Sequence, residues 1–153
     1  MKIAILGYGK MGRKVSELAT QLGHSISCTS NSNNPAKLLN LNNTDVAIDF
    51  STPNTAFENI SHAIKSGIPV VSGTTNWLNK LEEITKLCNK KNGAFLYAPN
   101  FSLGVNMFFK LNQELAKLMK GQDYDRKIHE IHHIQKIDSP SGTAIALQNE
   151  IDR

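Results

Sequence analysis

Apolar residues fall into two alternating patterns along most of the chain. Short runs rich in Ile, Val and Leu are typical of strands that are buried on both faces. Between them, apolar residues recur at helical spacing, as at Met11, Val15, Leu18 and Leu22. The short runs predict strands at residues 2–6, 26–29, 46–50, 68–71 and 94–97. The helical spacing predicts helices at residues 10–22, from 54 or 55 to Gly67, and at 78–90, 105–119 and 143–151.

Strands and helices that alternate with short connections indicate a parallel sheet covered on both faces. Right-handed crossovers then give a doubly wound α/β fold of Rossmann-like type. We therefore expect an α/β protein whose first domain covers residues 1–122.

The pattern changes after Gly121. Residues 126–134 mix charged and apolar side chains, which predicts a strand with one face toward solvent or a ligand. We expect residues 123–153 to begin a second domain of α+β type. One strand and one helix cannot bury a core alone. This piece must therefore pack on the first domain or on another subunit, or belong to a truncated chain.

Composition and charge narrow the class of protein. The 153 residues are 40% hydrophobic and 20% charged, as in ordinary globular proteins. No apolar run is long enough to span a bilayer, and no signal peptide is recognisable, so we expect a cytoplasmic protein without membrane contact. Cys28 and Cys88 stand outside any metal-type cluster and are expected to be buried thiols, with no metal site.

The net charge of +4 fits either nucleic acid or small anionic ligands. The lysines are scattered and no nucleic-acid-binding motif is present, so a nucleic-acid partner is not expected.

A glycine-rich turn follows the first predicted strand and opens the first predicted helix, in the pattern G-x-G-x-x-G. Its first glycine permits a tight turn, its second lets the backbone approach a pyrophosphate, and its third lets helix and strand pack closely. The helix N-terminus adds free N–H groups and a positive dipole. The residues predicted to bind a dinucleotide here are Gly7, Tyr8, Gly9, Lys10, Met11 and Gly12.

The residues after the second strand leave the choice of cofactor open. A carboxylate there would favour NAD, and an arginine would favour NADP. The chain has Ser30, Asn31 and Ser32 instead, which can hydrogen-bond either form. We expect Asn31 and Ser32 to bind cofactor, and NADH or NADPH to serve.

A second polar cluster lies near the end of the chain. Residues 141–143, Ser-Gly-Thr, follow Pro140 and open a helix, so their N–H groups and hydroxyls could hold a carboxylate. Lys136 adds a compact positive charge, and His132 has a side chain of the type that exchanges protons near neutral pH. Strict strand alternation would place His132 and His133 on opposite faces, unless a strand end or a bulge intervenes.

Residues 130–144, EIHHIQKIDSPSGTA, resemble the dihydrodipicolinate reductase signature E-x-H-H-x-x-K-x-D-x-P-S-G-T-A at every fixed position. Four further stretches agree with that family in order, at residues 7–12, 49–51, 73–75 and 100–106. The resemblance thus runs from the first strand to the last helix.

The resemblance implies reduction of 4-hydroxy-tetrahydrodipicolinate, also called dihydrodipicolinate, to tetrahydrodipicolinate with NADH or NADPH. That reaction belongs to lysine and diaminopimelate biosynthesis. His132 would donate or accept a proton and Lys136 would donate one. The residues implied to bind a substrate carboxylate are His133, Ser141, Gly142 and Thr143. Gly73, Thr74 and Thr75 would lie near the nicotinamide, and Ala98, Pro99, Asn100 and Phe101 would form a cofactor-contacting hinge.

Members of this family continue well past Arg153 and assemble as homotetramers through a broader C-terminal sheet. The chain is therefore expected to be truncated, with tetramer and activity dependent on that part. A dinucleotide-binding module without activity is the alternative. A different Rossmann oxidoreductase, such as an amino-acid dehydrogenase, would fit the glycine turn but not residues 140–144.

Overall fold

The computed structural model describes residues 1–132, 134 and 139–152. The chain divides into two compact units, Met1–Ala98 and Pro99–Arg153. The long helix that precedes Gly121 belongs to the second unit, so this division falls earlier in the chain than the boundary expected at residues 122–123.

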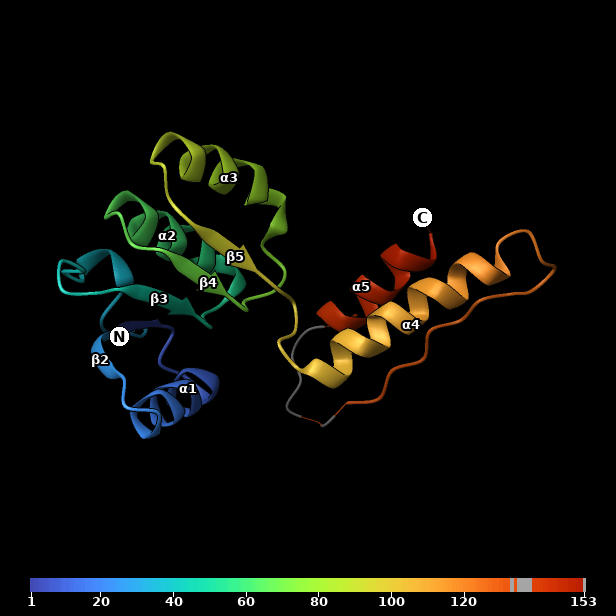
Figure 1. The fold of residues 1–153 in the computed structure, drawn as a ribbon, viewed down its shortest axis with the longest axis horizontal. Helices are drawn as coiled ribbons and strands as arrows, with labels where there is room; N and C mark the ends of the chain where they lie inside the picture. The colour runs from blue at the N-terminus through green and yellow to red at the C-terminus, as the bar shows by residue number, and fades with distance from the viewer. Residues whose placement is uncertain (133, 135–138, 153) are drawn as a thin grey trace. The chain divides into compact units, whose positions relative to one another are not determined.

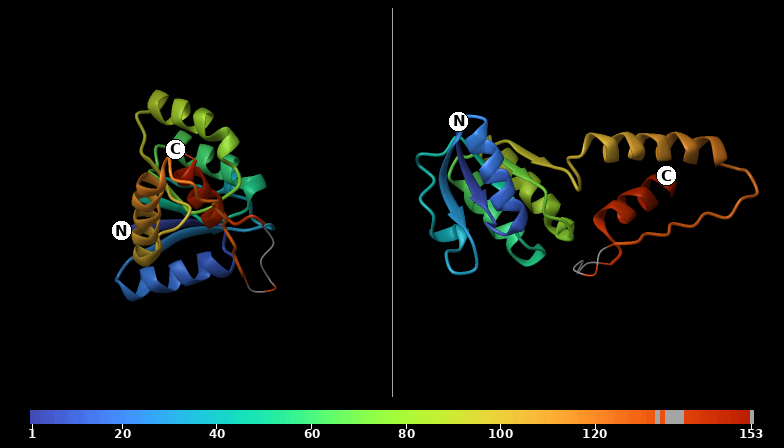
Figure 2. Two further views of the ribbon diagram at one scale, coloured as in Figure 1. Left: turned by 90° about the vertical axis from the view of Figure 1, so that its right-hand side faces the viewer. Right: turned by 90° about the horizontal axis from the view of Figure 1, so that it is seen from below.

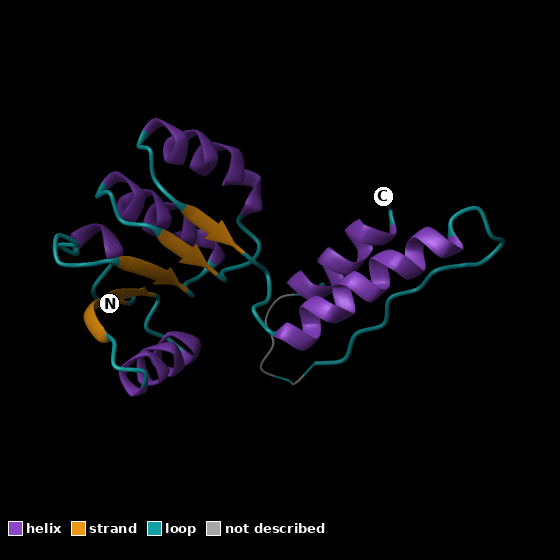
Figure 3. Cartoon of the chain, viewed as in Figure 1, coloured by secondary structure: helices purple, strands orange, loops and turns teal. Residues whose placement is uncertain are grey.

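The first unit contains a parallel sheet of five strands in the order β2-β1-β3-β4-β5 (Figures 1 and 3). The order reverses between β1 and β3, and in such sheets ligands bind at the carboxyl ends of the strands beside that point. The expected doubly wound α/β fold is confirmed. The strands are β1 (Lys2–Leu6), β2 (Ser25–Ser30), β3 (Val46–Asp49), β4 (Val70–Ser72) and β5 (Phe95–Tyr97).

The side chains of β1 show why helices cover both faces of the sheet. Ala4 and Leu6 belong to the larger core under α2 and α3, whereas Ile3 and Ile5 belong to a smaller core under α1. Figure 2 shows α1 on one side of the sheet and the other two helices on the opposite side. The helices of this unit are α1 (Lys10–Gln21), η1 (Ala36–Leu38), α2 (Pro53–Lys65), η2 (Leu78–Lys80) and α3 (Leu81–Lys90).

Helix α2 begins slightly earlier than the expected Asn54 or Thr55 cap. Thr52 is its N-cap, and the Thr52 N–H donates to Thr55 Oγ1 at 3.3 Å. Pro53 fits the first helical position because the N–H that it lacks would have no partner there. Gly67 follows the helix with a φ of +77°, as expected of a residue that ends a helix.

The second unit pairs α4 (Leu103–Met119) with α5 (Gly142–Ile151). Asn112 Nδ2 donates to the Leu147 carbonyl at 3.3 Å between them. The strand expected at residues 126–134 is wrong where it can be judged, because residues 126–132 and 134 form no strand. A strand needs a neighbour for its hydrogen bonds, and the described part of this unit offers none. No helix in the described ranges has the length and apolar character needed to cross a membrane.

Candidate cofactor and substrate sites

The glycine turn after β1 is packed too closely for side chains at two of its glycines. Gly7 has a φ of +97°, and a Cβ there would lie 2.4 Å from the Phe50 carbonyl oxygen. A Cβ on Gly12 would lie 2.2 Å from the Gly7 carbonyl oxygen. A Cβ on Gly9 would meet none of the described residues within 4 Å, so the space in front of Gly9 is open to them. The turn is therefore closely packed at Gly7 and Gly12 and open at Gly9, and the approach of a pyrophosphate to Gly9 stays a prediction.

The N-terminus of α1 is suited to hold an anion. Gly9 is the N-cap and supplies no side-chain cap, and the first turn contains no acidic residue. The first amide groups of a helix have no acceptor within the helix, and the helix dipole adds positive potential. Lys10 and Met11 are exposed here, and the Arg13 guanidinium lies over the Tyr8 ring at 5.7 Å. The residues present fit the pyrophosphate of a dinucleotide.

The end of β2 supports this turn through Ser30, whose role the motif did not reveal. Ser30 is buried, and its Oγ accepts the Gly7 N–H at 3.0 Å, while its carbonyl accepts the Tyr8 N–H at 2.6 Å. Asn31 Oδ1 accepts two backbone N–H groups of its own loop, both at 2.9 Å. The Asn31 side-chain oxygen is thus committed to the loop, and both Asn31 and Ser32 are exposed; their contact with cofactor stays a prediction.

A buried carboxyl group joins the ends of β3 and β4. Asp49 is 0% exposed and accepts hydrogen bonds from Ser51 Oγ at 2.7 Å, Ser72 Oγ at 2.8 Å and Thr74 Oγ1 at 2.7 Å. Asn59 Nδ2 on α2 is the fourth donor, at 3.4 Å. Burial raises the pKa of Asp49, and the four hydrogen bonds act against that rise. The sequence match marked Asp49 without giving it a role.

The predicted nicotinamide contacts at residues 73–75 lie beside this carboxyl group. A Cβ on Gly73 would lie 2.1 Å from the Phe50 ring, so a larger residue there would require that ring to shift. Thr74 is buried, and its carbonyl accepts the Trp77 indole N–H at 2.7 Å. Thr75 is half-buried. The fold thus brings residues 73–75 to the same sheet edge as the glycine turn, with the Thr74 hydroxyl committed to Asp49.

The predicted hinge at residues 98–101 coincides with the division between the units, which falls between Ala98 and Pro99. The Ala98 N–H donates to the Ser72 carbonyl at 3.2 Å. On the other side, Asn100 Oδ1 accepts the Ser102 N–H at 2.8 Å, and Phe101 is exposed. Cofactor contact and hinge motion at these residues remain predictions.

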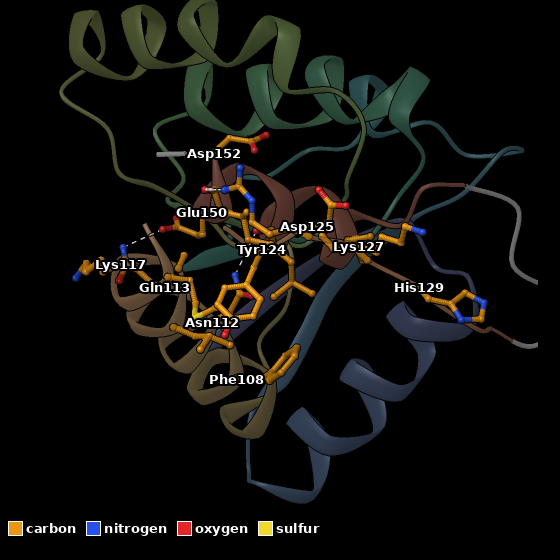
Figure 4. Close-up of a pocket in the computed structure, with 18 of the residues that line it drawn as sticks. Phe108, Asn112, Gln113, Lys117, Tyr124, Asp125, Lys127, His129, Glu150 and Asp152 are labelled. Atoms are coloured by element: carbon orange, nitrogen blue, oxygen red, sulfur yellow. Dashed lines mark hydrogen bonds between the residues drawn. The ribbon is translucent and has the colours of Figure 1, made fainter. Parts of the chain in front are cut away.

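The second unit contains a pocket of about 1050 Å³ between α4, the segment that follows it, and α5 (Figure 4). Its walls are joined by a hydrogen bond from Gln113 Nε2 to Glu150 at 2.8 Å, and by one from Arg126 to the Ile151 carbonyl at 3.0 Å. Of the predicted site residues, His132, Ser141 and Thr143 line the pocket.

Glu130 connects the predicted catalytic histidine with the predicted carboxylate-binding turn. Its Oε1 accepts the Ser141 N–H at 2.9 Å, and its Oε2 accepts the Ser141 hydroxyl in a short hydrogen bond. His132 Nδ1 lies 3.6 Å from Glu130 Oε2. Ser141 is the N-cap of α5 and Gly142 is its first helical residue, one position before the expected start at Thr143. His133 and Lys136, the other two predicted site residues of this segment, lie outside the described residues.

Comparison with known proteins decides the family. The family model described as "Dihydrodipicolinate reductase, N-terminus" matches residues 1–101, and that described as "Dihydrodipicolinate reductase, C-terminus" matches residues 104–153. The chain belongs to the dihydrodipicolinate reductase family. The two matches meet near the predicted hinge at residues 98–101.

Relatives in this family agree over most of the chain. A 4-hydroxy-tetrahydrodipicolinate reductase of Christiangramia forsetii is 51% identical over 99% of this chain, and one of Coxiella burnetii is 43% identical over 90%. The dipicolinate-bound dihydrodipicolinate reductase of a Paenisporosarcina species is 27% identical over 99% of the chain, with a TM-score of 0.69. The matched parts span 64%, 57% and 65% of the lengths of these three reductases.

Proposed function

We propose that this chain supplies the dinucleotide-binding and catalytic parts of an NAD(P)H-dependent 4-hydroxy-tetrahydrodipicolinate reductase of lysine and diaminopimelate biosynthesis. The observation that carries the proposal is the glycine turn at the N-terminus of α1. Two of its glycines are enclosed by backbone and the middle one faces open space. The family membership supplies the substrate class.

The first unit would hold the cofactor, which supplies a hydride when bound. The free amide groups at the start of α1 would bind the pyrophosphate, with Gly9 allowing close approach. Asn31 and Ser32 would bind the ribose in NADH or NADPH, because neither residue carries a charge that rejects a 2′-phosphate. Gly73 and Thr75 would lie beside the nicotinamide, on the loop that Asp49 holds.

The second unit would bind the dicarboxylate and manage the proton. Gly142 and Thr143 would present the first N–H groups of α5 to a carboxylate, with His133 as a further partner. His132 would donate or accept a proton, and Lys136 would donate the one that the reduced product needs. Residues 98–101 would act as the hinge that closes the two units on both ligands. We place the protein in the cytoplasm, as a homotetramer where the family's C-terminal sheet is present.

The alternative is a module that binds a dinucleotide without turnover. The His132 to Ala144 motif argues against it. The two proposals differ in whether turnover accompanies cofactor binding.

The test measures oxidation of NADH or NADPH by absorbance, with freshly made substrate. We expect turnover that Lys136→Ala abolishes and that Lys86→Ala, on the exposed surface of α3, leaves unchanged. Pyridine-2,6-dicarboxylate should compete with the substrate. Cofactor binding without turnover would support the module, and absence of both cofactor binding and turnover would contradict both proposals.

A further inference from the structure

Glu130 makes two hydrogen bonds to one residue that lies eleven positions later in the chain. The Ser141 N–H and the Ser141 hydroxyl each donate to one oxygen of the Glu130 carboxylate. The Ser141 Oγ in turn accepts the Ala144 N–H at 3.0 Å and so caps α5. A hydrogen bond to a carboxylate is stronger than one between neutral groups, so the start of α5 is held against residue 130.

These bonds decide which donors at the start of α5 remain for a ligand. Ser141 is 3% exposed, and both of its donors are used by Glu130. Gly142 and Thr143 carry the first two amides of the helix, which precede any acceptor within it. Within the described part of the chain, no acceptor bonds these two amides. The carboxylate site expected at residues 141–143 thus reduces to Gly142 and Thr143, with Ser141 as its support.

The same carboxylate faces the predicted catalytic histidine. Although residues 130–132 form no strand, the side chains of Glu130 and His132 lie beside each other. His132 Nδ1 lies 3.6 Å from Glu130 Oε2, a separation too long for a hydrogen bond but within the range of a charge contact when the imidazole is protonated. Ile131, between them, is 85% exposed.

We propose that Glu130 is a positioning residue that fixes His132 and the amides of Gly142 and Thr143 relative to one another. The proposal rests on the function proposed above. Glu130 itself does not contact the substrate. It holds the N-cap of α5, so that the two amides face a substrate carboxylate while His132 stays beside them.

A different role would follow if Glu130 only occupied the anion site until substrate arrived. The two roles predict opposite effects of Glu130→Gln on the affinity for pyridine-2,6-dicarboxylate. A positioning residue, once altered, weakens binding because the amides lose their support. A competing anion, once neutralised, leaves a freer site and tighter binding.

The experiment measures binding of pyridine-2,6-dicarboxylate by titration calorimetry in the presence of NADPH. We expect Glu130→Gln and Ser141→Ala each to raise Kd about tenfold, corresponding to about 1.4 kcal/mol. The double variant should cost little more than either single one, because both remove the same contact. Glu114→Gln, which neutralises an exposed carboxylate on α4, is the control and should leave Kd unchanged. Tighter binding by Glu130→Gln, or additive losses, would overturn the proposal.

Two nuclear magnetic resonance readouts separate this proposal from the function on which it rests. In both single variants, the Ala144 amide proton should exchange faster, because the cap of α5 is loosened or lost. The His132 ring ¹⁵N shifts should change in Glu130→Gln and not in Glu114→Gln.

If the unaltered chain binds no pyridine-2,6-dicarboxylate, the proposed function fails while these signals still test the positioning role. Unchanged signals in both variants would overturn the positioning role even where the ligand binds. If Glu130→Gln does not fold, Ser141→Ala still tests the proposal, because it leaves Glu130 in place and removes one of its two donors.

Discussion

The Thr74 hydroxyl donates to the buried carboxyl group of Asp49 at 2.7 Å across 25 positions of sequence. The same hydroxyl accepts the Ser51 N–H at 2.9 Å. One side chain of β3 therefore fixes both loops that leave the carboxyl ends of β3 and β4. This is where a doubly wound sheet binds its ligand, so the stability of the fold and the shape of the cofactor site depend on the same group.

Replacement of Asp49 by asparagine should destabilise the first unit. All four partners of Asp49 donate hydrogen bonds, and an amide would turn its NH₂ group toward two of them. We expect Asp49→Asn to lower the free energy of unfolding by about 1–3 kcal/mol. Urea unfolding followed by Trp77 fluorescence measures this, because Trp77 is buried and bonded to the Thr74 carbonyl.

Asp45→Asn is the matched control. Asp45 is exposed and accepts the Lys2 N–H at 2.7 Å through one oxygen, a bond that an asparagine carbonyl can keep. Its substitution should change the free energy of unfolding by less than about 0.5 kcal/mol. Equal effects of the two substitutions would show that the buried hydrogen bonds of Asp49 contribute nothing to the free energy of unfolding.

The pH dependence of stability should also reveal Asp49. Burial raises its pKa above the ordinary value of 3.8, so the folded state binds a proton more tightly than the unfolded state does. Stability from this group is fully present below pH 3.8 and is lost as pH rises through the raised pKa. The free energy of unfolding of the unaltered chain, minus that of Asp49→Asn, should therefore fall as pH rises. A difference that grows with pH would contradict the raised pKa.

The sequence predicted the parts of the fold that local patterns determine. The five strands follow from apolar runs. The turn follows from the pattern of glycines, two of which, Gly7 and Gly12, stand where a side chain would clash. The hydrogen-bond partners of Asp49 could not be predicted, because they join residues up to 25 positions apart and depend on strand order. The support that Ser30 gives to Gly7 was missed for the same reason, although a serine at the end of an apolar strand was a visible signal.

The second unit was harder to predict because its pattern depends on neighbours. The mixed run at residues 126–134 has the alternation of a half-exposed strand, yet its described residues form no ladder. Alternation shows which face could be buried and cannot supply the partner strand. By contrast, the helix that residues 141–143 were expected to open is present and begins one residue before the predicted Thr143, because a serine cap is a local signal.

Gly73→Ala should destabilise the first unit through its contact with Phe50. A Cβ at Gly73 would lie 2.1 Å from the half-buried Phe50 ring, so the ring must move aside. We expect a loss of about 1–3 kcal/mol in the free energy of unfolding. Gly73→Ala should cost less stability when it is added to Phe50→Leu than when it is added to the unaltered chain, because the smaller leucine leaves room for the Cβ. Strictly additive losses in the double-variant cycle would contradict direct contact as the cause.

Two alanine substitutions in the glycine turn should separate folding from cofactor binding. A Cβ at Gly12 would lie 2.2 Å from a backbone oxygen that cannot move aside. Gly12→Ala should therefore lower the free energy of unfolding by about 2 kcal/mol or more. Gly9 has a φ of −85°, which alanine adopts readily, and among the residues that the structure describes its Cβ would meet no atom within 4 Å. Gly9→Ala should therefore fold with nearly unchanged stability. Its methyl group would still stand where the pyrophosphate of a dinucleotide approaches, so the Kd for NADH and for NADPH should rise about tenfold or more. Thermal unfolding and cofactor fluorescence titration on the same samples measure both quantities. If Gly9→Ala bound both cofactors as the unaltered chain does, the dinucleotide could not lie across this turn.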